Sequence, residues 1–207
     1  MKVLLINGSP HEKGCTYTAL SLIAGELNAS GIETEILHVG GQPVGGCIGC
    51  GGCRKTGSGC VFGGVVNEAI EKAKTADAFV FGSPVHYASA AGNMASFMDR
   101  LAYAGGKYLA YKPAAICCSA RRAGTTTTLD QLVKYPQFFH MPLVNGSYWA
   151  MVHGSDPEQV LQDAEGCAVM QELGRNMAWL LRCIEAGKAA GIDHPQNPPR
   201  PMTSFIR

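Results

Sequence analysis

The chain has 207 residues, of which 46% are hydrophobic and 16% are charged, and its formal net charge at pH 7 is +1. This length supports one globular domain with a full hydrophobic core. The near-neutral charge, without a Lys/Arg tract, gives no electrostatic reason to expect nucleic-acid or membrane partners. No apolar run approaches the length of a membrane span, and the opening MKVLLINGSP is too short for a signal peptide, so we expect a cytoplasmic protein.

Apolar strands alternate with helical patterns along the chain. The apolar run at 2–7 is typical of a parallel strand that is buried on both faces. Residues 16–29 have helical spacing, and Gly31 stands where a helix stop is expected. The same criteria predict further strands at 33–39, 78–84, 113–120 and 142–147, and further helices at 65–76, 92–104, 127–135 and about 157–190.

Five strands alternating with five helices predict an α/β fold, in which a parallel sheet is covered by helices on both faces. Right-handed crossovers leave two common strand orders, the dinucleotide-binding order and the flavodoxin-like order 2-1-3-4-5. We expect a single domain over 1–207, with a cysteine-rich insert at 45–64 and an extended C-terminal tail at 194–207. Ligands bind such sheets at the carboxyl ends of the strands, which directs attention to the loops after strands one, three and four.

The loop after strand one, NGSPHEKGCTYTAL at 7–20, lacks the G-x-G-x-x-G spacing of a dinucleotide site. It offers short hydroxyl side chains and free backbone N–H groups where the first helix begins, which is a ready anion site. His11 and Lys13 add positive charge. The alternative is a plain N-capping turn, which Thr16 would also satisfy.

The loops after strands three and four carry groups suited to a planar ring. GSPVHYASAAGNM at 82–94 places His86 and Tyr87 just after a strand that Pro84 stiffens. SARRAGTTTT at 119–128 places two arginines at the same sheet edge. Each loop alone could be a solvated turn, but three such loops in one crevice favour a mononucleotide with a flat head group.

Four segments together resemble the NADPH-dependent FMN reductase family of flavodoxin-like proteins: GSPHEKGCTYTAL, CIGCGGCRKTGSGC, FGSPVHYASAAGNMASFMDR and SARRAGTTTTLDQL. The resemblance covers nearly the whole chain and implies a flavodoxin-like three-layer sandwich, with a five-stranded parallel sheet of order 2-1-3-4-5, that binds FMN. Relatives often have Arg and Asn at the positions of His11 and Cys15. The residues that the resemblance places around the FMN phosphate are Ser9, His11, Gly14, Cys15, Thr16 and Thr18. Those that it places along the isoalloxazine are Pro84, Val85, His86, Tyr87 and Ser89, and those that close the other side of the ring are Ser119, Ala120, Arg121, Arg122 and Gly124.

Four of the nine cysteines lie in one glycine-rich loop, GCIGCGGCRKTGSGC at 46–60. A disulfide is not expected in a reducing compartment, and structural zinc usually draws on two separated ligand pairs. The C-x2-C-x2-C spacing suits one [4Fe–4S] cluster, and the loop also resembles the iron–sulfur flavoprotein branch. A bare thiol loop beside the flavin, and a zinc site, remain open. The candidate metal ligands are Cys47, Cys50, Cys53 and Cys60, and the cysteines expected to be buried and inert are Cys117, Cys118, Cys167 and Cys183.

The resemblance implies an FMN-dependent NAD(P)H oxidoreductase that reduces a quinone, a flavin or another small-molecule or protein electron acceptor. The flavin carries the chemistry, and His86, Arg121 and Arg122 are the groups that could stabilise its anionic reduced form. One alternative is an iron–sulfur flavoprotein that carries electrons between a ferredoxin-like donor and FMN, and another is a flavin-binding sensor.

The resemblance also implies a homodimer or homotetramer. The aromatic residues Tyr148 and Trp149 fit such an interface, and ordinary core packing is the alternative.

Overall fold

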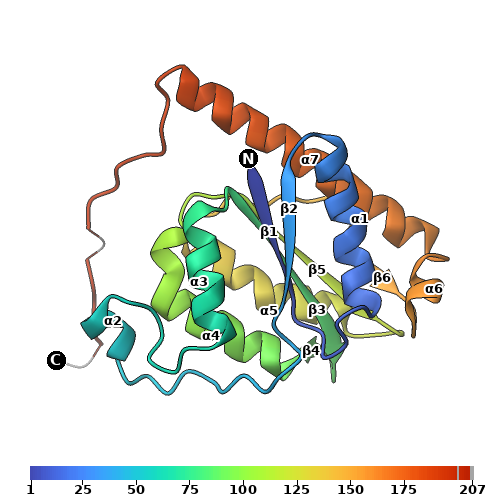
Figure 1. The fold of residues 1–207 in the computed structure, drawn as a ribbon, viewed down its shortest axis with the longest axis horizontal. Coiled ribbons are helices and arrows are strands. Elements are labelled where there is room, and N and C mark those ends of the chain that lie inside the picture. Colours follow the sequence, from blue (N-terminus) through green and yellow to red (C-terminus); the bar gives the residue numbers. More distant parts are fainter. Residues whose placement is uncertain (200, 206–207) are drawn as a thin grey trace.

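One mostly parallel sheet forms the centre of the computed structural model, which describes residues 1–199 and 201–205 (Figure 1). The strands run in the order β2-β1-β3-β5-β6, and a short β4 pairs antiparallel with the end of β3. Without β4, this is the predicted order 2-1-3-4-5, which is therefore confirmed. The strands are β1 (Lys2–Asn7), β2 (Glu33–His38), β3 (Ala78–His86), β4 (Ser89–Ala90), β5 (Ala114–Ala120) and β6 (Met151–His153).

Helices cover both faces of the sheet, because alternate strand residues point to opposite sides. Val3 and Leu5 of β1 are buried with α1 and α7, while Leu4 and Ile6 are buried with α3, α4 and α5. The helices are α1 (Cys15–Ala29), α2 (Gly52–Thr56), α3 (Val65–Thr75), α4 (Gly92–Gly105), the 3-10 helix η1 (Gly106–Tyr108), α5 (Thr125–Phe138), α6 (Pro157–Val160) and α7 (Ala164–Ala189).

Two predicted elements differ from the structure. The strand expected at 142–147 has a single isolated bridge, between Ala114 and Leu143, and the fifth parallel strand is β6 instead. The helical tract expected at about 157–190 is divided, because Asp156 and Asp163 each accept a hydrogen bond from a backbone N–H at the start of a separate helix. These two N-caps produce the short α6 and the long α7.

Helix α7 packs along α1, which follows directly on the first loop of the site (Figure 1). Gly174 allows the close approach, since a Cβ there would lie 2.7 Å from the carbonyl oxygen of Ile23. The two helices share one core cluster with β1. Helix α7 therefore supports α1, which directly follows the loop after β1.

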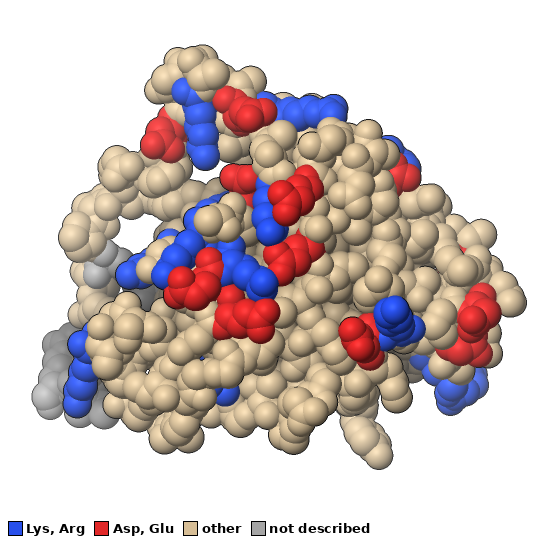
Figure 2. All heavy atoms as spheres, in the orientation of Figure 1, with Lys and Arg blue, Asp and Glu red and all other residues tan. Residues whose placement is uncertain are grey.

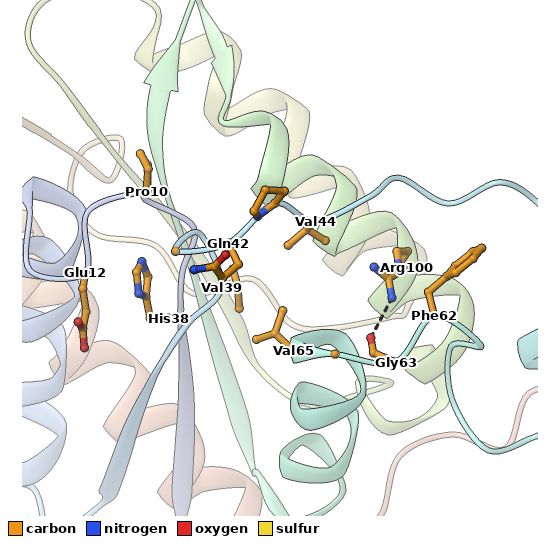
Figure 3. A pocket seen from close by; sticks show the side chains of 13 residues that line it. Pro10, Glu12, His38, Val39, Gln42, Val44, Phe62, Gly63, Val65 and Arg100 are labelled. Atoms are coloured by element: carbon orange, nitrogen blue, oxygen red, sulfur yellow. Dashed lines mark hydrogen bonds between the residues drawn. The ribbon is translucent and has the colours of Figure 1, made fainter.

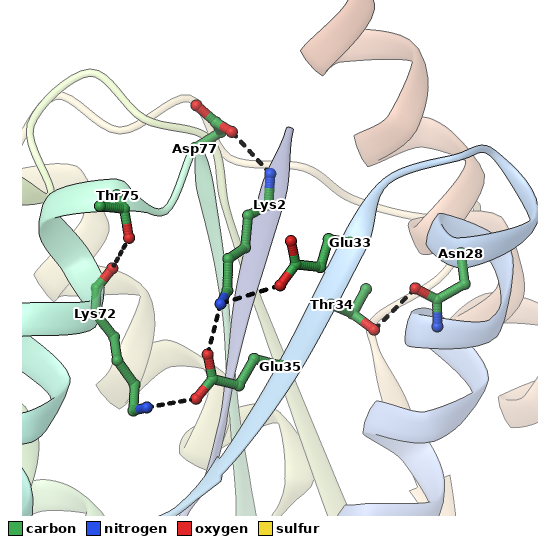
Figure 4. A network of polar contacts seen from close by, with 8 residues as sticks. All are labelled: Lys2, Asn28, Glu33, Thr34, Glu35, Lys72, Thr75 and Asp77. Carbon is green, nitrogen blue, oxygen red and sulfur yellow. Dashed lines mark hydrogen bonds and ion pairs between the residues drawn. The ribbon is translucent and has the colours of Figure 1, made fainter.

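An ion-pair network joins β1, β2 and α3 near the amino ends of the strands (Figure 4). Lys2 Nζ lies 2.8 Å from a carboxylate oxygen of Glu35 and 3.2 Å from one of Glu33, and Lys72 Nζ lies 2.6 Å from Glu35. Hydrogen bonds from Lys2 and then from Lys72 lower the pKa of Glu35. Positive and negative side chains are interspersed on this face of the molecule (Figure 2), in keeping with the net charge of +1.

The chain beyond α7 runs back along the molecule toward α2 as an extended segment (Figure 1). His194 stacks on Tyr111 with ring centroids 4.3 Å apart, and the Asn197 amide donates a 2.7 Å hydrogen bond to the Tyr111 hydroxyl. The tail predicted at 194–207 includes residues 200 and 206–207, which lie outside the described residues. None of the helices in the described ranges has the length and apolar character to cross a membrane.

Candidate functional site

The loop between β1 and α1 is held by its own polar groups. The Asn7 side chain accepts a hydrogen bond from the Ser9 backbone N–H and donates one to the Glu12 carbonyl. The Ser9 hydroxyl accepts from the His11 N–H at 3.1 Å. His11 is exposed. The part played by Asn7 was not predicted, although an Asn before Gly in a turn is its sequence signal.

The N-terminus of α1 is open to an anion. Its N-cap is Gly14, no side chain in the described part of the chain caps it, and its first turn contains no acidic residue. The capping alternative for Thr16 is therefore wrong, since Thr16 lies inside the helix. Thr18 is also inside the helix, where its hydroxyl donates to the Gly14 carbonyl. Uncapped N–H groups at the positive end of a helix favour a phosphate.

Thr16 and Ser119 link the first loop to the end of β5. Their hydroxyl oxygens lie 2.8 Å apart, and the two residues are 1% and 3% exposed. The fold brings these two residues together although they are 103 positions apart in the sequence, as expected for loops at the carboxyl ends of parallel strands. Because each hydroxyl already has the other as its partner, this pair fixes the loops rather than facing solvent.

Cys15, the first residue of α1, keeps its thiol proton beside the first loop. Its thiol donates to the Gly154 carbonyl, with sulfur and oxygen 3.6 Å apart. Burial is the main cause that raises the pKa of this thiol. A neutral thiol puts no negative charge against a phosphate at the helix N-terminus.

Strand β3 turns into β4 through a tight hairpin that carries predicted ring contacts. Tyr87 and Ala88 form the turn with φ of +49° and +56°, and Tyr87 is fully exposed. The turn is fastened to α5, since Thr127 donates to the Ala88 carbonyl and Ser89 donates to the Gln131 side chain. Pro84 and Val85 are half-buried and His86 is exposed at the end of β3.

The loop after β5 lies directly against this hairpin. Gly124 has φ of +92°, and a Cβ there would lie 2.6 Å from Ala88 Cα and 2.9 Å from Val85 Cγ1. Ala120 is buried, whereas Arg121 and Arg122 are exposed. The structure thus brings all three predicted loops together at one edge of the sheet.

The loop after β2 supports the first loop from the side, which the sequence did not reveal. A Cβ on Gly40 would lie 2.1 Å from the Ser9 carbonyl oxygen, and His38 Nε2 is 2.8 Å from the same oxygen. The Gly40 backbone therefore packs directly on the Ser9 backbone. An open hollow of about 790 Å³ flanks this contact (Figure 3). Its lining residues include Pro10, Glu12, His38, Gln42, Val65 and Arg100.

The four loop cysteines line a second hollow, of about 640 Å³, with the end of α4 as its opposite wall. In the described parts of the chain, no three His, Cys, Asp or Glu side chains converge closely enough to hold one metal ion. The charged side chains among the described lining residues are all positive: Arg54, Arg100 and Lys107. Four cysteine sulfurs with a basic lining fit an anionic iron–sulfur cluster, which spreads its ligands over several irons, better than a single zinc ion.

The other cysteines follow the prediction only in part. Cys117 and Cys118 are buried in β5, and burial raises both thiol pKa values, that of Cys118 to about 12. Cys167 is half-buried, and its thiol donates to the Val160 carbonyl. Cys183 is exposed on α7, so the expectation of burial is wrong there.

A parallel sheet of order 2-1-3-4-5, with an uncapped helix after strand one, defines a flavodoxin-like α/β protein. The family profile described as NADPH-dependent FMN reductase matches residues 1–156, and the chain belongs to that family.

Curated relatives of this chain are iron–sulfur flavoproteins. An iron–sulfur flavoprotein of Methanocaldococcus jannaschii is 28% identical over 89% of this chain and 100% of its own length. One of Archaeoglobus fulgidus is 35% identical over 48% of each chain.

Solved structures share the fold at lower identity. The structure of RosB with a bound flavin-phosphate intermediate has a TM-score of 0.70 and 15% identity, covering 100% of this chain and 94% of the other. An NADH:FMN oxidoreductase in its apo form has a TM-score of 0.62 and 18% identity, covering 88% of each chain. The family membership, with these relatives, supports FMN binding and a role as a flavin oxidoreductase or electron carrier.

Proposed function

We propose that this chain is an FMN-dependent NAD(P)H oxidoreductase that reduces a quinone, a flavin or another electron acceptor. The convergence of three loops at one sheet edge, fastened by the Thr16–Ser119 pair and the Gly124–Ala88 contact, carries the proposal. Bound FMN would supply the redox chemistry, taking a hydride from the nicotinamide and giving two electrons to the acceptor.

The residues of the chain bind and orient the flavin in this proposal. The loop from Ser9 to Thr18 and the N-terminus of α1 would hold the phosphate, with His11 adding a donor. The β3–β4 hairpin and the loop after β5 would flank the ring, where His86, Arg121 and Arg122 would stabilise negative charge on it. Because Arg121 and Arg122 are exposed, one of them can instead meet a phosphate of the nicotinamide nucleotide.

Anaerobic mixing tests this proposal. FMN-loaded protein is mixed with NADPH or with NADH, and the loss of the flavin absorbance band is followed. We expect bleaching with at least one donor, and slower bleaching in Arg121→Gln and Arg122→Gln than in the matched control Arg182→Gln, which lies on α7 beside Ser30. Absence of bleaching with both donors would exclude the reductase.

The second candidate function is an electron carrier, in which an iron–sulfur cluster passes electrons from a ferredoxin-like donor to FMN. The observation in its favour is that Cys47, Cys50, Cys53 and Cys60 line one basic hollow. Iron and acid-labile sulfide are measured on protein purified without oxygen. We expect both to fall in Cys60→Ser and to stay unchanged in Cys183→Ser, and near-zero content of both in the unaltered protein would rule out the carrier.

We also propose a homodimer or homotetramer. Tyr148 and Trp149 pack edge to face at 4.7 Å and are 50% and 58% exposed, so core packing does not account for them. Large exposed aromatic side chains are typical of interfaces. Light scattering after size exclusion should give a mass of two or four chains, and a monomer that retains FMN would contradict this assignment.

A further inference from the structure

Arg100 is a buried cation at the base of the cysteine loop. It lies in α4 and is 7% exposed. Its Nε donates to the Cys60 sulfur at 3.2 Å, and its Nη2 donates to the Gly63 carbonyl at 2.9 Å. Its Nη1 makes a longer contact, of 3.4 Å, with the Gly45 carbonyl. Each nitrogen of the guanidinium group thus donates to a different acceptor, which its planar arrangement of N–H groups allows.

The partners of Arg100 bracket the cysteine segment. Gly45 precedes Cys47, the first of the four cysteines, and Gly63 follows Cys60, the last of them. The Arg100 side chain therefore connects the two ends of the loop that carries all four thiols. Between these ends, α2 is exposed or half-buried, and the Cys53 thiol donates to the Tyr103 carbonyl. The Asn67 side chain also holds the Cys60 backbone, accepting from its N–H at 2.8 Å and donating to its carbonyl at 3.0 Å.

Arg100 also stands between the two hollows. It lines the hollow beside the first loop and the hollow of the cysteines, as does Phe62, whose ring centroid is 5.7 Å from the guanidinium carbon. Figure 3 shows the two side chains adjacent, with the dashed hydrogen bond from Arg100 to Gly63. Arg100 and Phe62 together form the wall between these spaces.

The charge of Arg100 is not offset by a carboxylate of any residue that the structure describes. Among the ion pairs of the described residues, none involves Arg100, and its three acceptors are two carbonyls and a sulfur. Burying a charge without an opposite charge is costly, so a buried guanidinium normally has an anionic partner. The atom in position to become that partner is the Cys60 sulfur, which is anionic when it ligates a metal.

We propose that Arg100 positions the cysteine loop and supplies the countercharge for an anionic metal–thiolate centre that Cys60 helps to hold. This inference rests on the cluster of the second candidate function. With such a centre bound, the Arg100 Nε–H group would keep Cys60 in place. The same hydrogen bond would raise the reduction potential of the centre, since hydrogen bonds to ligand sulfurs stabilise the more negative reduced state. Arg100 is thus a positioning residue that acts through Cys60.

Three variants separate this role from a general effect of charge. Arg100→Gln removes the charge and the fork, and Arg100→Lys keeps the charge but cannot reach three acceptors at once. Arg54→Gln is the matched control, because it removes an equal charge from the lining of the same hollow and leaves both loop ends fixed. Each is studied as the full chain loaded with FMN.

Two measurements follow on each variant. Amide hydrogen exchange over residues 45–64 is recorded in iron-free protein, and the reduction potential of the centre is recorded after anaerobic loading with ferrous iron and sulfide. For Arg100→Gln we expect loop exchange at least tenfold faster, less bound iron and a more negative potential. Arg100→Lys should exchange fast but keep a potential near that of the unaltered protein, and Arg54→Gln should leave loop exchange unchanged.

Loop exchange and potential that are the same in Arg100→Gln as in Arg54→Gln would overturn the proposal. If Arg100→Gln does not fold, slow exchange in Arg100→Lys overturns the positioning role, and fast exchange supports it. If the unaltered protein binds no iron, the proposed role of Arg100 as a countercharge is overturned. Flavin bleaching by NADPH, measured on the same samples, reports on the reductase function separately, because the unaltered protein can bleach whether or not Arg100 has this role.

Discussion

Replacing Gly124 by alanine should separate the two loops that we expect to flank the flavin ring. The positive φ of Gly124, +92°, costs an L-residue about 1–2 kcal/mol. The new Cβ would also lie 2.6 Å from Ala88 Cα, and relieving such an overlap costs about 1–3 kcal/mol more. Gly31 is the matched control, since it has φ of +77° and no atom of the described residues lies within 4 Å of a Cβ there, so Gly31→Ala carries the φ cost alone.

The differences in stability and in FMN affinity between Gly124→Ala and Gly31→Ala therefore report on the contact between Gly124 and the β3–β4 hairpin. Urea unfolding of flavin-free protein should show Gly124→Ala less stable than Gly31→Ala by about 1–3 kcal/mol. Titration of FMN fluorescence should show an FMN Kd raised about tenfold or more in Gly124→Ala, because the overlap is relieved by moving Val85–Ala88. Equal stability and equal FMN affinity of the two variants would refute this account of the site.

Three further predictions concern the loops and the sheet edge. Gly40→Ala should raise the FMN Kd about tenfold in the same titration, because its Cβ would displace the Ser9 carbonyl. Thr16→Val should cost about 1–3 kcal/mol in urea unfolding by leaving the Ser119 hydroxyl unpaired, and adding Ser119→Ala should recover part of the loss. Glu35→Gln should lower Tm by about 1–3 °C at pH 7. Because the pKa of Glu35 is lowered in the folded state, this Tm difference should close as pH falls below about 4; a constant difference would contradict the ion-pair account.

Much of the fold follows from local patterns. The helix predicted at 65–76 is observed at Val65–Thr75, and the strand at 2–7 is observed at Lys2–Asn7. Because the carboxyl ends of parallel strands share one edge, the strand order was enough to predict that the loops after strands one, three and four meet. The arrangement of the candidate site was therefore accessible once the order was known.

The features that the sequence did not reveal depend on contacts between residues that are far apart along the chain. The hairpin at Tyr87 and Ala88 has no glycine or asparagine to mark it, and it is held by Thr127 of α5. The burial of Arg100 joins positions 40 residues apart, and arginine in a helix normally indicates an exposed face. Residues 142–147 have an apolar start like that of a strand, but only Leu143 makes a bridge. In each case tertiary packing overrides the local signal.

The contact between α1 and α7 sets a limit on how the flavin site could be transplanted. The family match ends at residue 156, before α7 begins, yet Met170, Leu173 and Met177 of α7 are buried in the same cluster as the β1 side chains beneath α1. A graft that stopped at residue 156 would leave that face of α1 exposed to solvent. The smallest segment that could carry the predicted flavin site into another protein therefore includes α7, although α7 contributes no residue to the predicted flavin contacts.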